Sequence, residues 1–475
     1  MSSLLSITPA ESSKFDKMPA NISEFLSAEN LKALAKETRV SKRDRKMDIG
    51  VYLLSALAEA CEQHKDHLIT IANVNRKYAE MSGTEMSAKC IHNYIRRDQV
   101  LEYFRTVTGC TMRYALEALS KRAVKLMSGS VGKMLKKLGC EDIILIDGTE
   151  VPLIPGAEEQ FECKGKGPKK SDGSATPGLK LHIAFSLLKQ TIVAIEITGA
   201  CGSEREQVKE AFIKQFEGSK VLFLMDRGYV DAALEKQITD AGHLFLIKGK
   251  NGMSGKVTQA YMQNGRRAKT FIGKRVKDLH SDRNVDLQVD LNGKNKDSLR
   301  LIHVFNADAD DKKDRHIWLR TNLPRKLFGI VQIFQTYRLR WNIELSNMCN
   351  KSGSSLSGGN SGIKQIILIF VLASVIAYCL KACFANIARA KYGIEWLSME
   401  KCHCVTTQVI DLIKALIGRG ATVRWERSKA LAEHMATKCQ RTTPSQRDKD
   451  RLKDLPLLLD YINNAGPYCT DKIAA

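Results

Sequence analysis

The stretch DIILIDGTEVPL, residues 142–153, marks the change from helical to strand-like sequence. Before it, from residue 21 to residue 139, apolar residues recur at three- and four-residue spacing, which is typical of amphipathic helices. Within it, the continuous apolar run 143–146 is short and is followed by Asp147 and Gly148, a combination that indicates the end of a buried strand. The sequence therefore predicts helices up to about residue 139 and a buried strand directly after them.

Strands and helices alternate beyond this point, which predicts a mixed α/β sheet. A short turn at Lys189 and Gln190 joins two strand-like runs as a hairpin. The expected elements are, in order, strands over 179–188 and 191–198, a helix over 203–216, a strand over 220–225, a helix over 234–242 and a strand over 243–249.

The charge balance favours a polyanionic partner. The 475 residues include 74 Lys and Arg against 52 Asp and Glu, a net charge of +22, and the basic residues are spread over the whole length. Nucleic acid fits better than a membrane surface, because no segment resembles a lipid anchor or a basic amphipathic membrane helix. The strongest apolar run, 366–380, is shorter than the roughly 20 residues that span a bilayer, so we expect a buried core helix there and no membrane partner.

Cysteine usage and the N-terminus favour the cytosol. The thirteen cysteines are scattered, and the close group Cys402-His403-Cys404 lacks the spacing of a zinc site, so we expect reduced thiols. The first residues have neither the basic opening nor the apolar length of a signal peptide.

The N-terminal region contains a candidate DNA reader. Residues 71–97 combine two helical patterns around a Gly-containing turn, and Ser87 is placed to cap the second helix. A helix-turn-helix reader and a plain helical hairpin both fit, because this spacing is weakly specific. The second helix carries four basic side chains, Lys89, His92, Arg96 and Arg97.

Two aspartates stand after buried strands. Asp147 follows the run 143–146, and Asp226 follows the run that ends at residue 225. Burying a carboxylate in this position costs free energy unless a cation or a hydrogen-bond donor interacts with it. For each residue a structural role is the alternative: Asp147 as a turn former before Gly148, and Asp226 as the ion-pair partner of Arg227.

A third carboxylate lies in YRLRWNIELSNMCNK, residues 337–351, which we expect to form a single helix. At about 100° per residue, its charged and phenolic side chains share an arc of roughly 60°. The Ser- and Gly-rich run 352–362 has no evident means of packing, so the charged face is expected to border an open region. An ordinary solvated helix with an Arg340–Glu344 ion pair is the alternative. The residues on the shared face are Tyr337, Arg340, Glu344 and Lys351.

Three carboxylates that converge at one point repel one another unless divalent cations neutralise them. Mg²⁺ suits such a site because it takes hard oxygen ligands and keeps positions open for water and phosphate. Two ions about 4 Å apart can activate a nucleophile and stabilise the leaving oxygen of a phosphoryl transfer. The sequence therefore predicts a site of Asp147, Asp226 and Glu344 that holds two Mg²⁺ ions, with Mn²⁺ as a substitute, and performs phosphoryl transfer on nucleic acid.

These residues resemble the DDE transposases of the insertion-sequence-four family. Tyr337, Arg340, Glu344 and Lys351 match the family signature Y-(2)-R-(3)-E-(6)-K, and "DGT" at 147–149 and "DRGY" at 226–229 resemble its two aspartate motifs. The resemblance covers roughly residues 140–385 and includes a β-rich insertion between the second aspartate and the glutamate.

The resemblance implies an RNase H-like catalytic core in which Asp147, Asp226 and Glu344 are the metal ligands. It also implies that Tyr337, Arg340 and Lys351 contact the transposon-end DNA, with Trp318 or Trp341 stacking on a flipped base; a core position is the alternative for both tryptophans. The implied activity is cut-and-paste transposition, with cleavage at terminal inverted repeats, often through a hairpin intermediate, and joining to target DNA by a homodimer. A bacterial cytoplasmic location on DNA is expected.

The expected organisation has five segments, and two other functions remain open. An RNase H-like nuclease or resolvase without strand transfer would use the same acids, and a transposase-derived DNA-binding protein would have lost cleavage. Dimerisation is a candidate role for the C-terminal region. The segments are an N-terminal helical DNA-binding region at 1–139, a core in two parts at 140–249 and 316–389, a β-rich insertion at 250–315 and a C-terminal helical region at 390–475.

Overall fold

The computed structural model describes twelve segments of the chain, and all structural statements below concern them. They are residues 3–9, 19–40, 47–62, 68–118, 129–163, 176–250, 253–279, 281–291, 298–306, 315–356, 359–394 and 397–440.

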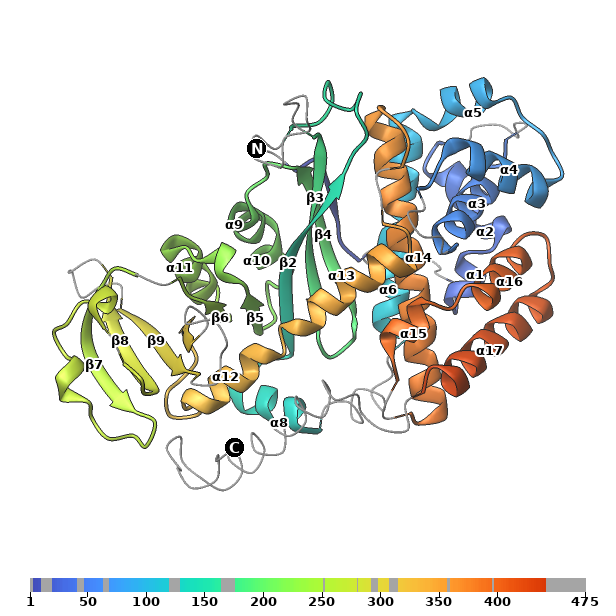
Figure 1. Cartoon of the computed structure of the whole chain (residues 1–475). Coiled ribbons are helices and arrows are strands. Elements are labelled where there is room, and N and C mark those ends of the chain that lie inside the picture. The colour runs from blue at the N-terminus through green and yellow to red at the C-terminus, as the bar shows by residue number, and fades with distance from the viewer. Residues whose placement is uncertain are drawn as a thin grey trace.

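A ten-stranded mixed sheet runs through the molecule, in the order β1-β4-β3-β2-β5-β6-β10-β9-β8-β7 (Figure 1). The mixed α/β class expected from the sequence is therefore confirmed. The strands are β1 (Leu5–Ile7), β2 (Asp142–Pro152), β3 (Gly178–Ser186), β4 (Thr191–Gly199), β5 (Val221–Met225), β6 (Leu244–Lys248), β7 (Lys256–Met262), β8 (Val285–Asp290), β9 (Ser298–Phe305) and β10 (His316–Thr321).

The centre of the sheet combines antiparallel and parallel pairs. Strands β2, β3 and β4 are antiparallel, and β3 and β4 form the predicted hairpin around Gln190, which has a positive φ of 50°. Strands β5 and β6 run parallel to β2, because helical segments carry the chain back between them. Alternate residues of these strands enter two apolar clusters: Ile143 and Leu145 belong to one, and Ile144 and Ile146 to the other.

Helices cover both faces of this central sheet. One face packs against α9 (Glu204–Gln207), a π-helical turn (Val208–Phe212), α10 (Ile213–Gln215) and α11 (Ala232–Asp240). The other faces α6 (Asp98–Glu117), α12 (Ile330–Arg338), α13 (Trp341–Gly353) and α14 (Lys364–Tyr392). The remaining helices are α1 (Ile22–Phe25), α2 (Ala28–Glu37), α3 (Ile49–Cys61), α4 (Ile71–Ser82), α5 (Ala88–Ile95), α8 (Gly129–Leu138), α15 (Met399–His403), α16 (Thr407–Ala415) and α17 (Ala421–Lys438).

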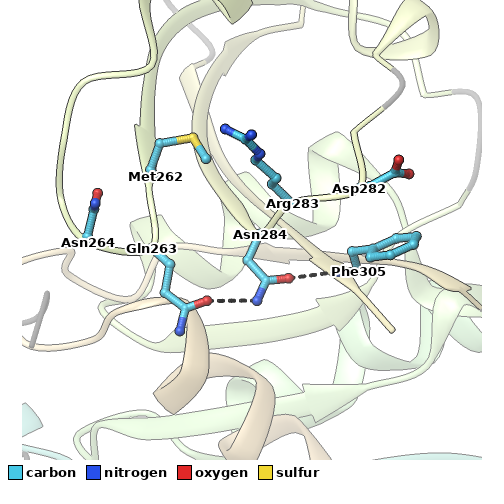
Figure 2. Close-up of a pocket in the computed structure, with 7 residues that line it drawn as sticks. All are labelled: Met262, Gln263, Asn264, Asp282, Arg283, Asn284 and Phe305. Atoms are coloured by element: carbon cyan, nitrogen blue, oxygen red, sulfur yellow. Dashed lines mark hydrogen bonds between the residues drawn. The ribbon is translucent and has the colours of Figure 1, made fainter. Parts of the chain in front are cut away.

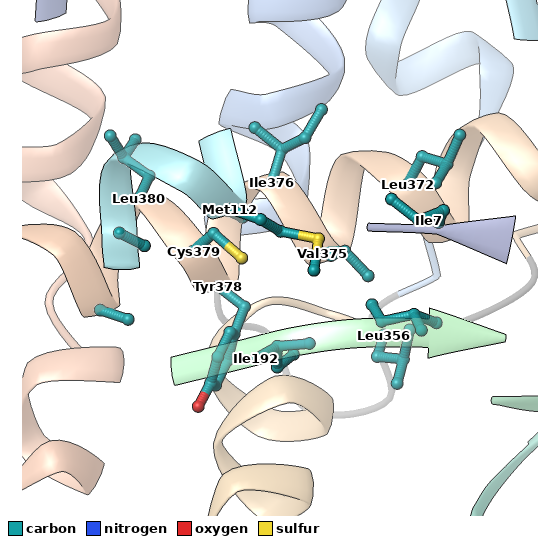
Figure 3. Packing of buried hydrophobic residues seen from close by; sticks show 14 of the residues in the cluster. Ile7, Met112, Ile192, Leu356, Leu372, Val375, Ile376, Tyr378, Cys379 and Leu380 are labelled. Atoms are coloured by element: carbon teal, nitrogen blue, oxygen red, sulfur yellow. The ribbon is translucent and has the colours of Figure 1, made fainter. Parts of the chain in front are cut away.

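Helix α14 is the centre of the larger core. Figure 3 shows its side chains between β1, β4 and α6, where Leu372 and Met112 lie among the buried residues. By length and composition α14 could cross a membrane, but its apolar window is wholly buried within the protein. The expected core helix is therefore observed, and it is longer than the apolar run 366–380.

The Ser- and Gly-rich segment after α13 corrects one expectation. Ser354, Ser355 and Leu356 are buried, and Gly359 lies against Ile69 and Phe370. The small residues pack closely because they allow the backbone to approach neighbouring helices. In the part of this run that the structure describes, residues 354–356 and Gly359 are therefore packed against the core.

The β-rich insertion continues the same sheet. Strands β7, β8 and β9 form an antiparallel ladder, which we call the β lobe together with its loops at residues 253–306, and β10 joins this ladder to β6. At the junction, the buried carboxylate of Asp286 accepts hydrogen bonds from Arg300 and from Arg325. The backbone pairing of β6 with β10 connects the lobe to the central strands.

The N-terminal region forms the predicted helices and one unpredicted strand. Helices α4 and α5 flank a turn at Gly83, and Ser87 Oγ accepts a hydrogen bond from the backbone N–H of Cys90, so the predicted cap is confirmed. Strand β1 pairs with β4 at the edge of the sheet. In the described residues the cysteines are free thiols, and most of them are buried.

Candidate active site

The two motif aspartates lie side by side at one edge of the central sheet. Ile146 of β2 pairs in parallel register with Met225 of β5, so Asp147 and Asp226 are the next residues on neighbouring strands, whose spacing is about 4.8 Å. Asp147 follows Ile146 of the α11-side cluster within β2, so its side chain lies on the other face of the sheet, towards α13. The pairing register thus brings together two acids that are 79 positions apart in the sequence (226 − 147).

The sequence suggested that Asp147 directly follows a strand, but in the structure Asp147 lies within one. Strand β2 continues to Pro152 through its pairing with β3, although its pairing with β5 ends at Ile146. This excludes the turn-former alternative for Asp147. Asp226 does follow its strand, and its Oδ1 accepts a hydrogen bond of 2.6 Å from the backbone N–H of Arg227.

The segment that carries Glu344 is two helices and not the single helix expected. Helix α12 ends at Arg338 and α13 begins at Trp341, because the backbone N–H groups of Leu339 and Arg340 bond to carbonyls three residues earlier. This tighter turn still leaves Arg340 paired with Glu344. The side chain of Glu344 is 28% exposed and that of Arg340 is 15% exposed, so the pair is partly buried.

Asn347 links α13 to the aspartate edge. Its Nδ2 donates a 2.9 Å hydrogen bond to Asp147 Oδ2, and Asn347 lies one turn after Glu344 on the same helix. Sequence reasoning missed this residue, although its position three residues after Glu344 is the signal that could have identified it. The contact fixes α13 against β2.

The charges of the site act on one another. Burial raises the pKa of Asp147 to about 6; the charge of Arg340 and a bond from the backbone of Gly148 oppose the rise, and Glu204 and Glu344 add to it. Burial also raises the pKa of Tyr337, which Arg340 lowers and Asp226 and Glu344 raise further. The expected acids, Arg340 and Tyr337 therefore share one electrostatic environment.

Glu204 is a fourth acid at this edge that sequence reasoning missed. It is the first residue of α9, and its Oε1 lies 2.5 Å from Lys180 Nζ. The sequence SEREQ gives an ordinary reason for an acid at this position, since acids favour a helix N-terminus. The proximity of Glu204 to the aspartates depends on the tertiary structure.

The other predicted DNA contacts differ in exposure. Lys351 is exposed near the end of α13, two helical turns after Glu344. The hydroxyl of Tyr337 is buried and has no hydrogen-bond partner in the described part of the chain. Trp341 is 37% exposed. Trp318 is 8% exposed and packs on His303 in the β lobe, with ring centroids 4.5 Å apart, so it occupies the core position that was its alternative.

The donor chemistry of the edge suits a hard divalent cation. Carboxylate and amide oxygens predominate, and the Oδ1 of Asn347 is buried without a hydrogen-bond partner in the described segments. Within those segments, no group of three or more His, Cys, Asp or Glu residues is arranged to hold a metal ion. Glu344 is instead paired with Arg340, so a complete ligand set requires this pair to separate.

A separate polar pocket of about 440 Å³ lies at one end of the β lobe (Figure 2). Asn284 connects two segments that line the pocket. The Nδ2 of Asn284 donates a hydrogen bond to Gln263 Oε1, and its Oδ1 accepts one from the backbone N–H of Phe305, each at 2.8 Å. None of its lining residues belongs to the carboxylate edge. The lining residues are Met262, Gln263, Asn264, Asp282, Arg283, Asn284 and Phe305.

Comparison with known proteins identifies the region that contains the acids. Residues 138–353 match the family model of the transposase DDE domain, a segment that begins at the last residue of α8 and ends with α13. Among solved structures, the chain is similar to a piggyBac transposase synaptic complex with hairpin DNA, at 10% identity and a TM-score of 0.41, over 90% of this chain and 85% of that one. No curated protein sequence matches.

Proposed function

We propose that this chain, which is a DDE-type transposase through the domain at residues 138–353, binds the terminal inverted repeats of an insertion sequence and cuts and rejoins DNA there. The observation that carries the proposal is the register of β2 and β5. It places Asp147 beside Asp226, under the helix that carries Glu344. The register supports the pairing of the two motif aspartates, and the bond from Asn347 ties the helix with Glu344 to the same edge of the sheet.

Asp147, Asp226 and Glu344 are the residues that would hold two Mg²⁺ ions, with Mn²⁺ as a substitute. Bound there, the ions would supply nucleophile activation and stabilisation of the leaving oxygen. Asn347 orients Asp147 through its hydrogen bond, and Arg340 is the ion-pair partner of Glu344. Separation of the Arg340–Glu344 pair would free the carboxylate of Glu344 to bind a cation. It would also free the guanidinium of Arg340 to bind a DNA phosphate.

The remaining residues of the signature would position the DNA end. Lys351 is exposed and can contact a phosphate without loss of internal packing. Trp341 is the better exposed of the two tryptophans and lies next to Arg340, so it is the proposed stacking surface for a flipped base. Tyr337 carries a buried hydroxyl with no partner in the described residues, and a shift of α12 would be needed before that hydroxyl reached DNA.

The narrower assignments belong to the same proposal. Membership of the insertion-sequence-four family rests on the four-residue signature, and an RNase H-like core is supported by three antiparallel strands followed by two parallel ones. The net charge of +22 supports double-stranded DNA as the partner. A homodimer on the DNA, a hairpin intermediate and a bacterial cytoplasmic location follow from the family resemblance.

Mapping the reaction products tests the proposal. The purified chain would be incubated with Mg²⁺ and a DNA fragment that carries the ends flanking its gene, together with a target plasmid. Cleavage at the repeat boundary, followed by joined 3′ ends, is the expected result. Cleavage without joining would indicate a nuclease or resolvase, and end binding without cleavage would indicate a non-catalytic derivative.

A further inference from the structure

Seven exposed basic side chains lie on the connection between β7 and β8, at residues 263–279 and 281–284. The acids of the same two segments are Asp278 and Asp282, both exposed, so five positive charges remain in excess (7 − 2). Within the described residues, none of the seven basic side chains has an ion-pair partner. The β lobe therefore carries a concentration of positive charge that the described chain does not neutralise. The seven side chains are Arg266, Arg267, Lys269, Lys274, Arg275, Lys277 and Arg283.

Backbone hydrogen bonds fix part of this connection against β7, the last strand of the sheet. The N–H of Ala268 donates to the carbonyl oxygen of Ala260 at 2.8 Å, and the N–H of Val257 donates to that of Lys274 at 2.9 Å. We call residues 266–277, which follow β7 in this way, the outer ribbon. Because apolar members of the ribbon enter the core of the lobe, its charged side chains remain on the outside. These buried members are Ala268 and Val276.

The outer ribbon begins at the same end of the sheet as the motif aspartates. Asp226 directly follows β5, which is parallel to β6, and the antiparallel pairs from β6 to β7 fix the direction of each strand of the lobe. In this register the last residue of β7, Met262, and the first residue of β8, Val285, lie at the end of the sheet where β5 finishes. Arg267 follows the first of these residues and Arg283 precedes the second. Cations of the lobe and carboxylates of the candidate site therefore lie at one end of the sheet.

Protection of an edge strand is the structural explanation for such charges, because charged side chains discourage pairing with another chain. The backbone of the outer ribbon already occupies part of the outer side of β7, however, so fewer edge groups remain to be protected. Like charges close together also repel one another, which stabilises neither the lobe nor the ribbon. An anionic partner would remove this repulsion.

The row of cations has the dimensions of a contact with DNA. Isolated bridges pair Arg267 with Tyr261 and Arg275 with Lys256, so the outer ribbon follows β7 over five residue steps (261 − 256), which is about 17 Å of strand. Double-stranded DNA carries roughly ten phosphate charges over that length. A small anion would contact only a few neighbouring cations, whereas a duplex can contact the whole row.

We propose that the outer ribbon binds the phosphate backbone of double-stranded DNA, in a contact that is independent of sequence and separate from the carboxylate edge. The inference rests on the proposed function, because that function makes DNA the substrate. The ribbon holds the same DNA molecule on which Asp147 and Asp226 act.

The first test measures DNA binding by the full chain after three charges of the outer ribbon are removed. In Arg266→Gln/Arg267→Gln/Lys269→Gln, we expect the affinity for a labelled duplex, measured by fluorescence anisotropy, to fall at least about tenfold at physiological salt. The slope of log K against log salt should fall by about 2–3, because each phosphate contact contributes about 0.9. The slope should fall equally for a duplex with the element ends and for one of equal length without them. An unchanged slope, or a decrease confined to the duplex with the ends, would overturn the inference.

A matched variant removes the same charge from another surface. Lys214→Gln/Lys220→Gln/Lys236→Gln changes three exposed lysines of α10, α11 and the segment between them. Lys220 directly precedes β5, at the opposite end of this strand from Asp226. The matched variant should bind DNA with nearly the wild-type salt slope. Equal losses in the two variants would show an effect of net charge alone and would contradict the inference.

Hydroxyl-radical footprinting separates a local DNA contact from edge protection. The wild type should protect a stretch of DNA backbone apart from the cleavage site, and the Arg266/Arg267/Lys269 variant should lose protection at that stretch alone. If the charges only prevent β7 from pairing with another chain, this variant should aggregate, which light scattering detects, and should keep the DNA affinity and footprint of the wild type. That second result would overturn the inference.

Asp226→Asn distinguishes failure of the inference from failure of the proposed function. Asp226→Asn should lose cleavage and keep the wild-type footprint, because the outer ribbon is unchanged. Wild-type binding and footprint in the ribbon variant, together with lost cleavage in Asp226→Asn, would overturn only the inference. Cleavage by Asp226→Asn would overturn the proposed site, whereas a lost footprint in the ribbon variant would still support the DNA contact.

Discussion

Glu344 is the ion-pair partner of Arg340 and also the carboxylate that we propose as catalytic. It pairs with Arg340, which directly precedes α13, as residues four positions apart on a solvated helix commonly do. The same carboxylate also raises the pKa of Asp147, so its charge reaches the aspartate edge. The two roles predict different consequences of the same substitution.

Glu344→Gln should abolish cleavage and preserve binding of the DNA ends. A lost metal ligand removes several kcal/mol of stabilisation of the reaction, so we expect a loss of about a hundredfold or more in cleavage rate. Binding should persist because it depends mainly on Lys and Arg contacts. Gel-shift and cleavage assays with Mg²⁺ measure both quantities. If the Arg340–Glu344 pair is only structural, Arg340→Ala and Glu344→Gln should both reduce stability slightly and leave cleavage intact.

Lys351→Ala should weaken end binding and cleavage without destabilising the fold. Lys351 is exposed, so its loss removes a phosphate contact and no internal packing. The slope of log K against log salt should fall by about 1, as expected for one lost phosphate contact. Lys236→Ala is the control, because Lys236 is an exposed lysine of α11 whose side chain is 66% exposed. An unchanged salt slope for Lys351→Ala would exclude a phosphate contact.

Buried His182 should make the protein less stable in acid. Burial lowers the pKa of His182 to about 3, while the unfolded chain keeps a value near 6.5. The unfolded state therefore binds the proton first, and stability falls as the pH drops from about 6.5 towards 3. Between pH 7 and pH 5 this histidine should cost about 2 kcal/mol. Urea unfolding of wild type and His182→Gln at both pH values checks this, and an identical decrease in the two proteins would contradict it.

At the scale of elements, the segment between α13 and α14 tests how close packing depends on glycine. Gly359 has a φ of +66°, and a Cβ there would lie 2.4 Å from the Phe370 ring and 2.8 Å from the Ile69 carbonyl oxygen. Gly359→Ala should therefore destabilise the protein by about 2–4 kcal/mol through strain and overpacking.

Gly393 is the matched control for this prediction. It has a φ of +63° at the end of α14, but nothing lies within 4 Å of a Cβ there. Gly393→Ala should cost about 1 kcal/mol, from backbone strain alone. Chemical denaturation of both variants gives the comparison. Similar losses would show that φ, and not packing, determines the requirement at Gly359.

The sequence predicts elements best where the signal is local. The runs around Ile144 and Leu224 are continuous and apolar, so both strands were predictable, and Ser87 gave the start of α5. Strand β1 is only three residues long and depends on pairing with β4, which no local pattern indicates. The continuation of β2 past Asp147 likewise depends on its pairing with β3.

Some residues of the candidate site can also be identified from local sequence, whereas others depend on the tertiary structure. Asp147, Asp226 and Glu344 can be picked out from apolar runs and helical spacing, whereas the proximity of the two aspartates depends on the sheet register. Glu204 is not recognisable, because an acid at a helix start has an adequate local explanation. The break at Leu339 was missed because the helical pattern continues across it. The packing of residues 354–356 and Gly359 was missed because composition does not indicate it.

At the scale of the whole molecule, Asp286 connects the β lobe to the segment before α12. It is fully buried between Arg300 and Arg325, and Arg300 also donates to the carbonyl oxygens of Leu323 and Phe328. Asp286→Asn would leave two guanidinium groups without their counter-charge, and we expect a loss of about 3–5 kcal/mol. Urea unfolding measures the loss, with the exposed Asp278→Asn in the same lobe as control. A loss below 1 kcal/mol would show that the two arginines find other partners.

The unbroken ladder from β7 to β1 has a mechanical consequence. Strands β6 and β10 are hydrogen-bonded neighbours, so the lobe and the aspartate edge belong to one continuous sheet. If the proposed DNA substrate contacts both the lobe and the aspartate edge, we expect the sheet to set the distance between the two contacts. One base pair inserted between those contacts turns the DNA helix by about a tenth of a turn, so the spacing of the two contacts on the DNA should affect binding.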